Sequence, residues 1–263
     1  MRCFLASFRK ELHCAGLYRF DFALRIAYSL IAMYGYRCLW TALYAQNPAV
    51  AGRDLPSMIT YAMLAALLGL LFNPFDRAAA PHQYLADQIR TGAISSDLLR
   101  PMNLQNQLLM RSASSVLFTL LALALPAWAL GVGLPASPLC AAGFFCSLAL
   151  GYVVSFSLNF LLGLICFVTL DIRSVVFAYV GVTRIFSGEL IPFELFPDWL
   201  RPLCRALPFQ YMASAPLNIY TGQYAPPEML RVLAMEACWA AALLAAGRLL
   251  WRAVHRRLIV QGG

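Results

Sequence analysis

The stretch SASSVLFTLLALALPAWALGVGLPASPLCAAGFFCSLALGYVVSFSLNFLLGLICFVTL, residues 112–170, decides the fold class of this chain. Its 59 residues contain no Asp, Glu, Lys, Arg or His, and as one helix they would extend about 88 Å. The hydrocarbon core of a bilayer is only about 30 Å thick, so the stretch must form two membrane spans. Glycine and proline at 131–138 (GVGLPASP) predict the break between them.

The composition of the whole chain agrees with a membrane protein. Of its 263 residues, 61% are hydrophobic and 12% are charged, which is about half the charged fraction of a soluble domain. So few charges cannot cover the surface of a soluble domain of this size. The 17 Phe, 12 Tyr and 5 Trp residues also exclude a disordered chain.

Apolar runs of sufficient length predict an all-α, polytopic helical bundle with six transmembrane helices. Residues 1–263 are expected to form a single transmembrane domain. Residues 1–21 alternate cations with apolar residues at helical spacing, which favours an N-terminal interfacial helix over a cleaved signal peptide. An ordinary soluble helix remains the alternative there. The six spans are expected at about 23–45, 55–75, 107–131, 138–170, 174–188 and 229–250.

The distribution of basic residues predicts the orientation. The net charge is +8, from 19 Arg and a single Lys against 12 acidic residues. Arginines gather in both termini and in residues 76–111, whereas the 131–138 turn has none, so both termini are expected in the cytoplasm. Cations at span ends do not indicate nucleic acid as a partner. The loop after the fifth span is the weakest point, because it holds Arg201 and Arg205 together with three acidic residues.

Catalytic chemistry is not evident in the sequence. There is no Lys after position 10, so the chain has no P-loop of its own. The histidines, at 13, 82 and 255, lie outside the predicted spans, and no metal site is expected. The chain is therefore expected not to be an enzyme and to bind no cofactor.

One charge inside a predicted span needs an explanation. Arg37 lies about twelve residues into the first span, where a cation is costly unless it meets water, a partner or a functional cavity. With Tyr34 and Trp40 it is a candidate for the translocation path. The alternatives are a snorkelling side chain or a buried structural pair, with the aromatic residues forming an interfacial belt.

Two segments are not explained by membrane insertion alone: YLADQIRTGAISSDLLRP at 84–101 and GELIPFELFPDWLRPLCRALPFQY at 188–211. Together they resemble ABC-2 type transporter permeases, the six-span transmembrane subunits of ABC exporters. We call residues 84–101 the inner segment and residues 188–211 the outer segment. The resemblance implies that the inner segment carries a coupling helix, at about 82–92, that docks on the ATPase. Leu85 and Ile89 would give this helix an apolar edge and Gly92 would stop it. The expected coupling residues are Tyr84, Leu85, Asp87, Gln88, Ile89, Arg90 and Gly92.

The outer segment is expected to be a re-entrant helical hairpin before the last span. Its prolines prevent one continuous helix, while its many apolar side chains demand burial. Irregular backbone at membrane depth is tolerated only against protein or water, so the segment is expected to form an outer gate. An amphipathic surface hairpin is the alternative. The expected gate residues are Gly188, Glu189, Pro192, Pro197, Pro208 and Tyr211.

The resemblance implies the permease subunit of an ATP-driven exporter in a bacterial inner membrane, moving an amphiphilic or lipid-like substrate. Its expected partners are a P-loop ATPase that binds ATP and Mg, a second permease chain in a homo- or heterodimer, and membrane lipids. Import remains open as the direction. The alternatives are a secondary transporter, with Arg37 and Glu236 as its coupling site, and a non-transporting membrane scaffold.

Overall fold

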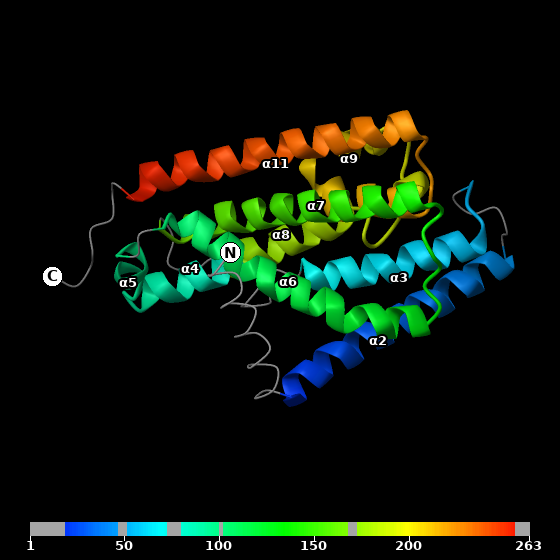
Figure 1. The fold of residues 1–263 in the computed structure, drawn as a ribbon, viewed down its shortest axis with the longest axis horizontal. Coiled ribbons are helices and arrows are strands. Elements are labelled where there is room, and N and C mark those ends of the chain that lie inside the picture. Colours follow the sequence, from blue (N-terminus) through cyan, green and yellow to red (C-terminus); the bar gives the residue numbers. More distant parts are fainter. Residues whose placement is uncertain (1–18, 47–51, 73–79, 100–101, 168–172, 256–263) are drawn as a thin grey trace.

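The computed structural model describes residues 19–46, 52–72, 80–99, 102–167 and 173–255, and these ranges contain helices and connecting turns but no strand (Figure 1). The all-α expectation is therefore confirmed for this part of the chain. The elements are α2 (Arg19–Gln46), α3 (Leu55–Leu71), α4 (Pro81–Arg90), α5 (Ile94–Leu98), α6 (Leu104–Ala129), α7 (Pro138–Leu164), η2 (Ile165–Phe167), α8 (Arg173–Phe186), η3 (Phe193–Leu195), α9 (Leu200–Ala206), η4 (Pro208–Met212), α10 (Ser214–Tyr220) and α11 (Pro226–His255).

Three of the described helices are long and apolar enough to cross a membrane: Leu104–Ala129, Pro138–Phe167 and Pro226–Val254. The 17-residue α3 is also apolar but shorter. The 28-residue α2 is long but carries several charges, and the 14 residues of α8 extend only about 21 Å. A helical membrane bundle is thus supported, while six spans remain a prediction.

Several helix boundaries differ from the expected ones. α3 ends at Leu71 rather than 75, because Asn73 precedes a proline and is disfavoured in the helical region. α6 begins three residues before 107, and α8 ends at Phe186, just before Gly188 adopts a φ of +78°. α11 extends beyond both predicted ends of the last span. Residues 1–18, most of the predicted interfacial helix, lie outside the described residues.

The predicted break between the third and fourth spans is present. α6 ends at Ala129 and α7 begins at Pro138, the first position of a helix, where proline is well tolerated. The hydroxyl of Ser137 caps α7 by accepting a hydrogen bond from the backbone N–H of Cys140 at 3.1 Å. Local residues thus set the start of α7, while the backbone N–H of Gly133 donates to the hydroxyl of Thr60 in α3 and that of Ala136 to the carbonyl of Tyr220 in α10, which hold the turn in place.

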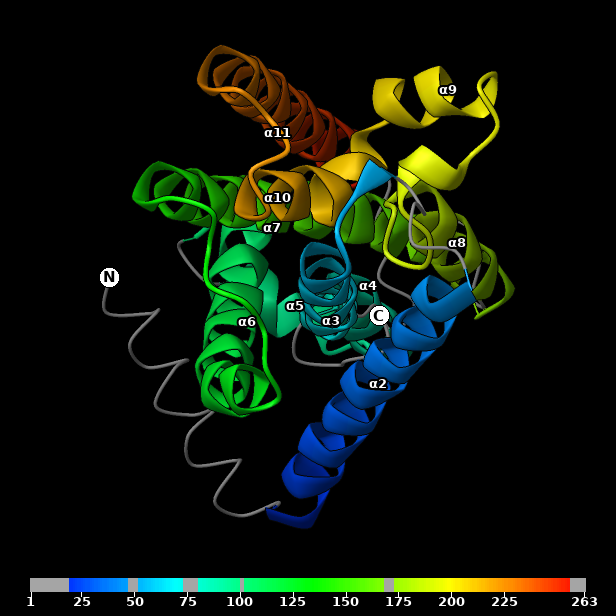
Figure 2. The same ribbon diagram turned by 90° about the vertical axis from the view of Figure 1, so that its right-hand side faces the viewer.

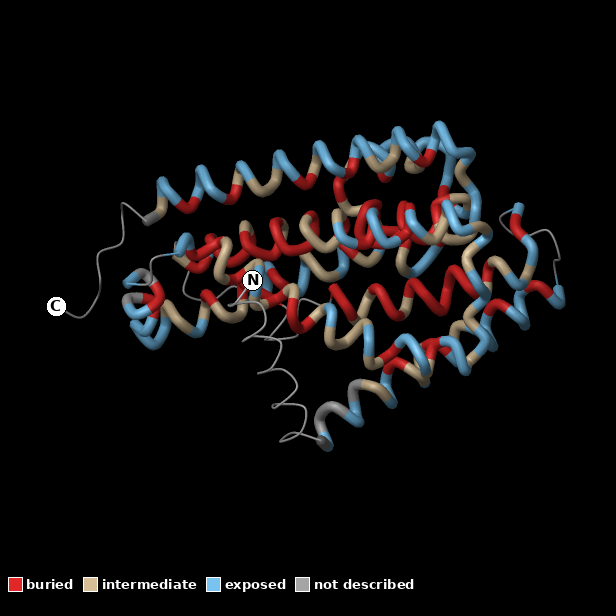
Figure 3. The backbone as a smooth tube through the Cα atoms, in the orientation of Figure 1, coloured by how far each residue is buried: buried red, intermediate tan, exposed pale blue. Residues whose placement is uncertain are grey.

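α7 is the central helix of the bundle. Its most apolar stretch is 61% buried, against 28% for α6 and 17% for α11. Seen along the long axis, α11 lies on one side of α7 and α3 on the other (Figure 2). The exposed residues of α11 follow its outer edge (Figure 3). α4 and α5 gather at one end of the bundle, while α9 and the turn between α6 and α7 lie at the opposite end (Figure 1).

Candidate coupling, gating and binding sites

The inner segment folds into two short helices, α4 and α5. α4 starts with Pro81 and ends at Arg90, followed by Gly92 at a φ of +70°. A positive φ favours glycine and is the usual conformation of a residue that stops a helix. The expected coupling residues therefore share one helix and its terminal turn.

The apolar edge of α4 is covered largely by its own chain: Leu85 is buried and Ile89 is half-buried, so Leu85 is not open to a partner as the expected anchor role requires. Leu85 is fully buried within its own chain, in a cluster with Phe160 and Trp251. A β-carbon on Gly163 of α7 would lie 2.7 Å from Cδ1 of Leu85. Ile89 packs on the end of α7 and on α8. A helical pattern marks an apolar edge but does not say what covers it, and here α7 covers it.

Tyr84 ties the two short helices to α6. Its hydroxyl donates a hydrogen bond to the carboxylate of Asp97 in α5. The guanidinium of Arg111 in α6 lies 4.5 Å from the centre of the Tyr84 ring, at a distance suited to a cation–π interaction. Tyr84 therefore positions the inner segment rather than extending from it.

The outward surface of this end of the bundle is formed by other residues. Asp87, Arg90 and Thr91 are exposed, and Gln88 is half-buried. Leu99, just after α5, is 87% exposed, more than any other large apolar side chain within the described ranges. An apolar side chain so open to solvent at the inner end is a candidate anchor for a partner.

His82, near the start of α4, packs against Gly163 of α7. Its side chain is buried next to the amide of Asn159 in α7. Burial lowers the pKa of His82 to about 4, an effect that the Asn159 amide opposes. His82 is therefore neutral while α4 is packed on α7.

The outer segment enters the bundle, as two short helices joined by a 3₁₀ turn. α9 is largely exposed, whereas residues 211–219 are all buried, so the inserted part continues beyond the expected end at Tyr211. Pro208 opens η4 and is buried; Pro192, buried before η3, and the exposed Pro197 bound the preceding loop. Seen from the end of the bundle, α10 lies across α7 (Figure 2).

Arg53, in the loop before α3, organises this segment and was missed by the sequence reasoning. Its side chain is buried and donates hydrogen bonds to Glu194 and Asn218, both at 2.6 Å, and to Thr221 at 3.4 Å. It also lies 4.8 Å from the ring centre of Tyr61 in α3. The available signal was an arginine in a loop predicted to be outside, where basic residues are rare.

α7 approaches the two segments at two glycines. A β-carbon on Gly163 would lie 2.8 Å from the Cα of His82 in α4, and one on Gly151 would lie 2.3 Å from the carbonyl oxygen of Tyr211. Both contacts are with backbone, so no side-chain rotation could relieve them. The two glycines are twelve residues, or about 18 Å, apart along the helix. α7 thus contacts the inner and the outer segment directly.

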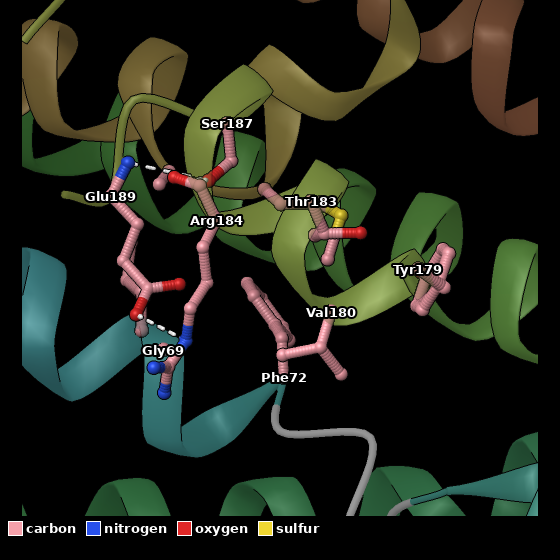
Figure 4. A pocket seen from close by; sticks show the side chains of 11 residues that line it. Gly69, Phe72, Tyr179, Val180, Thr183, Arg184, Ser187 and Glu189 are labelled. Carbon is pink, nitrogen blue, oxygen red and sulfur yellow. Dashed lines mark hydrogen bonds and ion pairs between the residues drawn. The ribbon is translucent and has the colours of Figure 1, made fainter. Parts of the chain in front are cut away.

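A pocket separates α3, α8 and the start of the outer segment (Figure 4). In it, Nε of Arg184 lies 3.6 Å from Oε1 of Glu189, and the two side chains point toward each other. The carboxylate rests against Gly69 of α3, where a β-carbon would approach Oε1 to 2.2 Å. The remaining lining residues are Leu68, Phe72, Tyr179, Val180, Thr183, Ser187, Met212 and Ala213.

The expected translocation residues of α2 have different surroundings. Arg37 donates from Nη1 to the carbonyl oxygen of Leu130 at 2.7 Å, at the C-terminal end of α6. Tyr34 is 58% exposed, while Trp40 is buried against α3. Glu236, the other member of the suggested coupling pair, accepts a hydrogen bond from Ser147 of α7 at 2.8 Å. Arg37 and Glu236 therefore have separate partners.

Comparison with protein families identifies the family of this chain. A family model described as ABC-2 family transporter protein matches residues 30–262. No curated protein matches the chain. The matched range contains the inner segment, the outer segment and the pocket.

Proposed function

This chain belongs to the ABC-2 family of transporter proteins, and from that premise we propose that it is the permease subunit of an ATP-driven exporter in a bacterial inner membrane. A separate P-loop ATPase subunit binds ATP and Mg and drives the transport. Both termini and the α4–α5 end of the bundle face the cytoplasm, in agreement with the arginine distribution.

The observation that carries the proposal is the backbone contact between α4 and α7. Because the Cα of His82 lies against Gly163, α4 cannot move toward the bundle without displacing α7. α7 also contacts the carbonyl oxygen of Tyr211 in the outer segment, through Gly151. A push on α4 from an ATPase would therefore reach the outer segment through one rigid helix.

The ATPase contacts the outward surface of the inner end rather than the apolar edge of α4. Asp87, Arg90 and Leu99 form this surface, with Leu99 as the apolar anchor. A small apolar anchor surrounded by polar groups is the usual arrangement at the centre of a protein interface. Leu85 holds α4 on α7 and acts on the ATPase only indirectly.

A second permease chain or lipid covers the exposed face of α2. Large apolar side chains follow one another there at helical spacing, and they are substantially exposed. A transporter of two permease chains has room for a substrate path between them, and an amphiphilic substrate suits the apolar walls. The exposed residues of this face are Phe20, Leu24, Tyr28, Ile31 and Leu39.

Co-purification tests the proposal. The chain is expressed with the genes that neighbour its own, and we expect a P-loop ATPase to co-elute. Leu99→Asp should abolish this association, whereas Leu134→Asp, at an 81% exposed leucine between α6 and α7, should not. Association that survives Leu99→Asp would exclude the proposed surface. A partner that binds without substrate-stimulated ATP hydrolysis would instead favour a scaffold.

A further inference from the structure

Glu236 of α11 carries a carboxyl group that its own chain surrounds completely. Its relative exposure is 0%, and it lies ten residues after Pro226, the first residue of α11. That helix is one of the three that are long and apolar enough to cross a membrane. Ionisable side chains in such helices are rare and commonly mark a functional site. Since the proposed export function gives Glu236 no role, its burial needs a separate explanation.

Only one oxygen of this carboxyl group has a partner. Oε2 accepts a hydrogen bond from the hydroxyl of Ser147 in α7 at 2.8 Å. Oε1 is buried and has no hydrogen-bond partner among the residues that the structure describes. A buried carboxylate needs several hydrogen bonds or a cation to offset the free energy lost on leaving water. As an anion, Glu236 would therefore be poorly satisfied.

The elements that pack on α11 supply no positive charge to Glu236 in the described part of the chain. These elements are α7 and η4. Their titratable side chains, which are neutral or negative in every form, are Cys140, Cys146, Tyr152 and Tyr211. On α11 itself, Cys238 is exposed, and so are Glu228 and Arg231, the charged residues nearest to Glu236 in sequence. The carboxyl group is thus without a counter-charge.

The unpartnered oxygen lies where the outer segment meets α7. A β-carbon on Gly151 would be 3.4 Å from Oε1 of Glu236 and 2.3 Å from the carbonyl oxygen of Tyr211. Gly151 follows Ser147 by four residues, so both lie on the same face of α7. An ionised carboxylate would repel the nearby carbonyl oxygen, whereas a proton on Oε1 removes that repulsion. The geometry therefore suits the neutral acid.

We infer that Glu236 is a proton-binding site, which holds its proton while η4 packs on α7 and releases it when the outer segment moves away. In this step the O–H bond of the acid breaks, the carboxylate keeps the electron pair, and water that enters beside Gly151 takes the proton. Because only the open site solvates the carboxylate, proton release favours the displaced outer segment. The inference goes beyond the export proposal, since it requires neither ATP nor an ATPase.

Infrared spectroscopy of the purified chain in maltoside micelles at pH 7.5 tests which form is present. A protonated carboxyl group has a carbonyl stretching band that a carboxylate lacks. We expect this band in the wild-type chain and its loss in Glu236→Gln. Glu228→Gln, which changes an exposed glutamate of the same helix, is the matched control and should keep the band. Absence of the band from the wild type, or its persistence in Glu236→Gln, would overturn the inference.

Hydrogen exchange of the amides in residues 208–219 tests the link to the outer segment. The packed state holds the proton and the displaced state releases it, so the stability of the packing is present at low pH and is lost as the pH rises. Between pH 6 and 8.5 the opening equilibrium of the wild type should rise by up to about tenfold for each pH unit, after correction for intrinsic exchange rates. Glu236→Gln should show no such rise. A wild-type opening that is independent of pH, or an equal rise in Glu236→Gln, would contradict the link.

Gly151→Ala provides a variant that keeps every titratable group. Its β-carbon would meet the backbone of Tyr211, so η4 must move off α7. We expect the carboxylic acid band to be lost at pH 7.5, and this variant decides the matter if Glu236→Gln does not fold. Gly181→Ala, where no atom lies within 4 Å of the new carbon, is the control and should keep the band. A band that persists in Gly151→Ala would show that the outer segment does not hold the proton in place.

Discussion

Nη2 of Arg53 donates a hydrogen bond to Oε1 of Glu194 at 2.6 Å, joining residues that are 141 positions apart in the chain. The arginine side chain is 1% accessible and that of the glutamate 33%. The pair fastens the loop before α3 to the outer segment, and Asn218 extends it to α10. The outer segment is therefore held by a buried charge as well as by apolar packing.

Arg53→Leu should destabilise the protein by about 3–5 kcal/mol, because it leaves the buried amide of Asn218 and the Glu194 carboxylate without their donor. Thermal unfolding in micelles measures the loss. Asp198→Asn, at an exposed ion pair with Arg201, should change stability by less than about 1 kcal/mol. Equal effects of the two substitutions would contradict the role of Arg53 in holding the outer segment.

Gly163→Ala should uncouple ATP hydrolysis from transport. The new β-carbon meets the backbone of His82, so α4 must shift away from α7, at a cost of about 1–3 kcal/mol. The ratio of transported substrate to ATP hydrolysed in proteoliposomes measures the coupling. Gly181→Ala on α8 serves as the control. A normal ratio in Gly163→Ala would show that this contact does not transmit the ATP-driven movement of α4 to the bundle.

Acidification should loosen α4. Burial lowers the pKa of His82 to about 4, below the ordinary value of 6.5, so the packed helix holds neutral His82. The undocked state binds the proton first, and stability that is present above pH 6.5 is lost as the pH falls toward 4. At pH 5 the loss is about 2 kcal/mol. Hydrogen exchange of the α4 amides at pH 5 and 7.5 measures it, after correction for the intrinsic exchange rates.

The variant His82→Gln supplies the control for this pH dependence, since it removes the titrating group. Its α4 amides should show nearly the same opening free energy at pH 5 and 7.5. A pH dependence that persists unchanged in His82→Gln would assign the effect to another group.

Arg37→Met should lower stability by about 1–2 kcal/mol and leave most transport activity. The lost interaction is a charged hydrogen bond to the Leu130 carbonyl at the C-terminal end of α6, where a cation also complements the helix dipole. Unfolding and transport are measured on the same preparation. Unchanged stability with abolished transport would instead support the candidate role of Arg37 in the translocation path.

Features with local causes could be predicted from the sequence, and features with distant causes could not. The break at 131–138 and the helix stop at Gly92 are marked by nearby glycine, proline and serine, and the structure has both. The apolar edge of α4 was visible, but its cover is a helix about 75 residues away in the chain. Arg37 finds its acceptor 93 residues away, and Arg53 finds Asn218 at a separation of 165. Neither contact can be inferred from the spacing of residues near Arg37 or Arg53.

The packing of Leu85 against Gly163 has a consequence for biosynthesis. The ribosome completes α4 well before α7, so Leu85 has no place to be buried until the fourth predicted span has entered the bilayer. Asp87 and Arg90 lie on the same helix as Leu85, so their placement depends on that burial. A nascent or truncated chain would therefore lack the finished form of the surface that we propose for the ATPase. Binding of the ATPase would then select assembled permeases, because only a permease with α7 in place holds α4 in its final position.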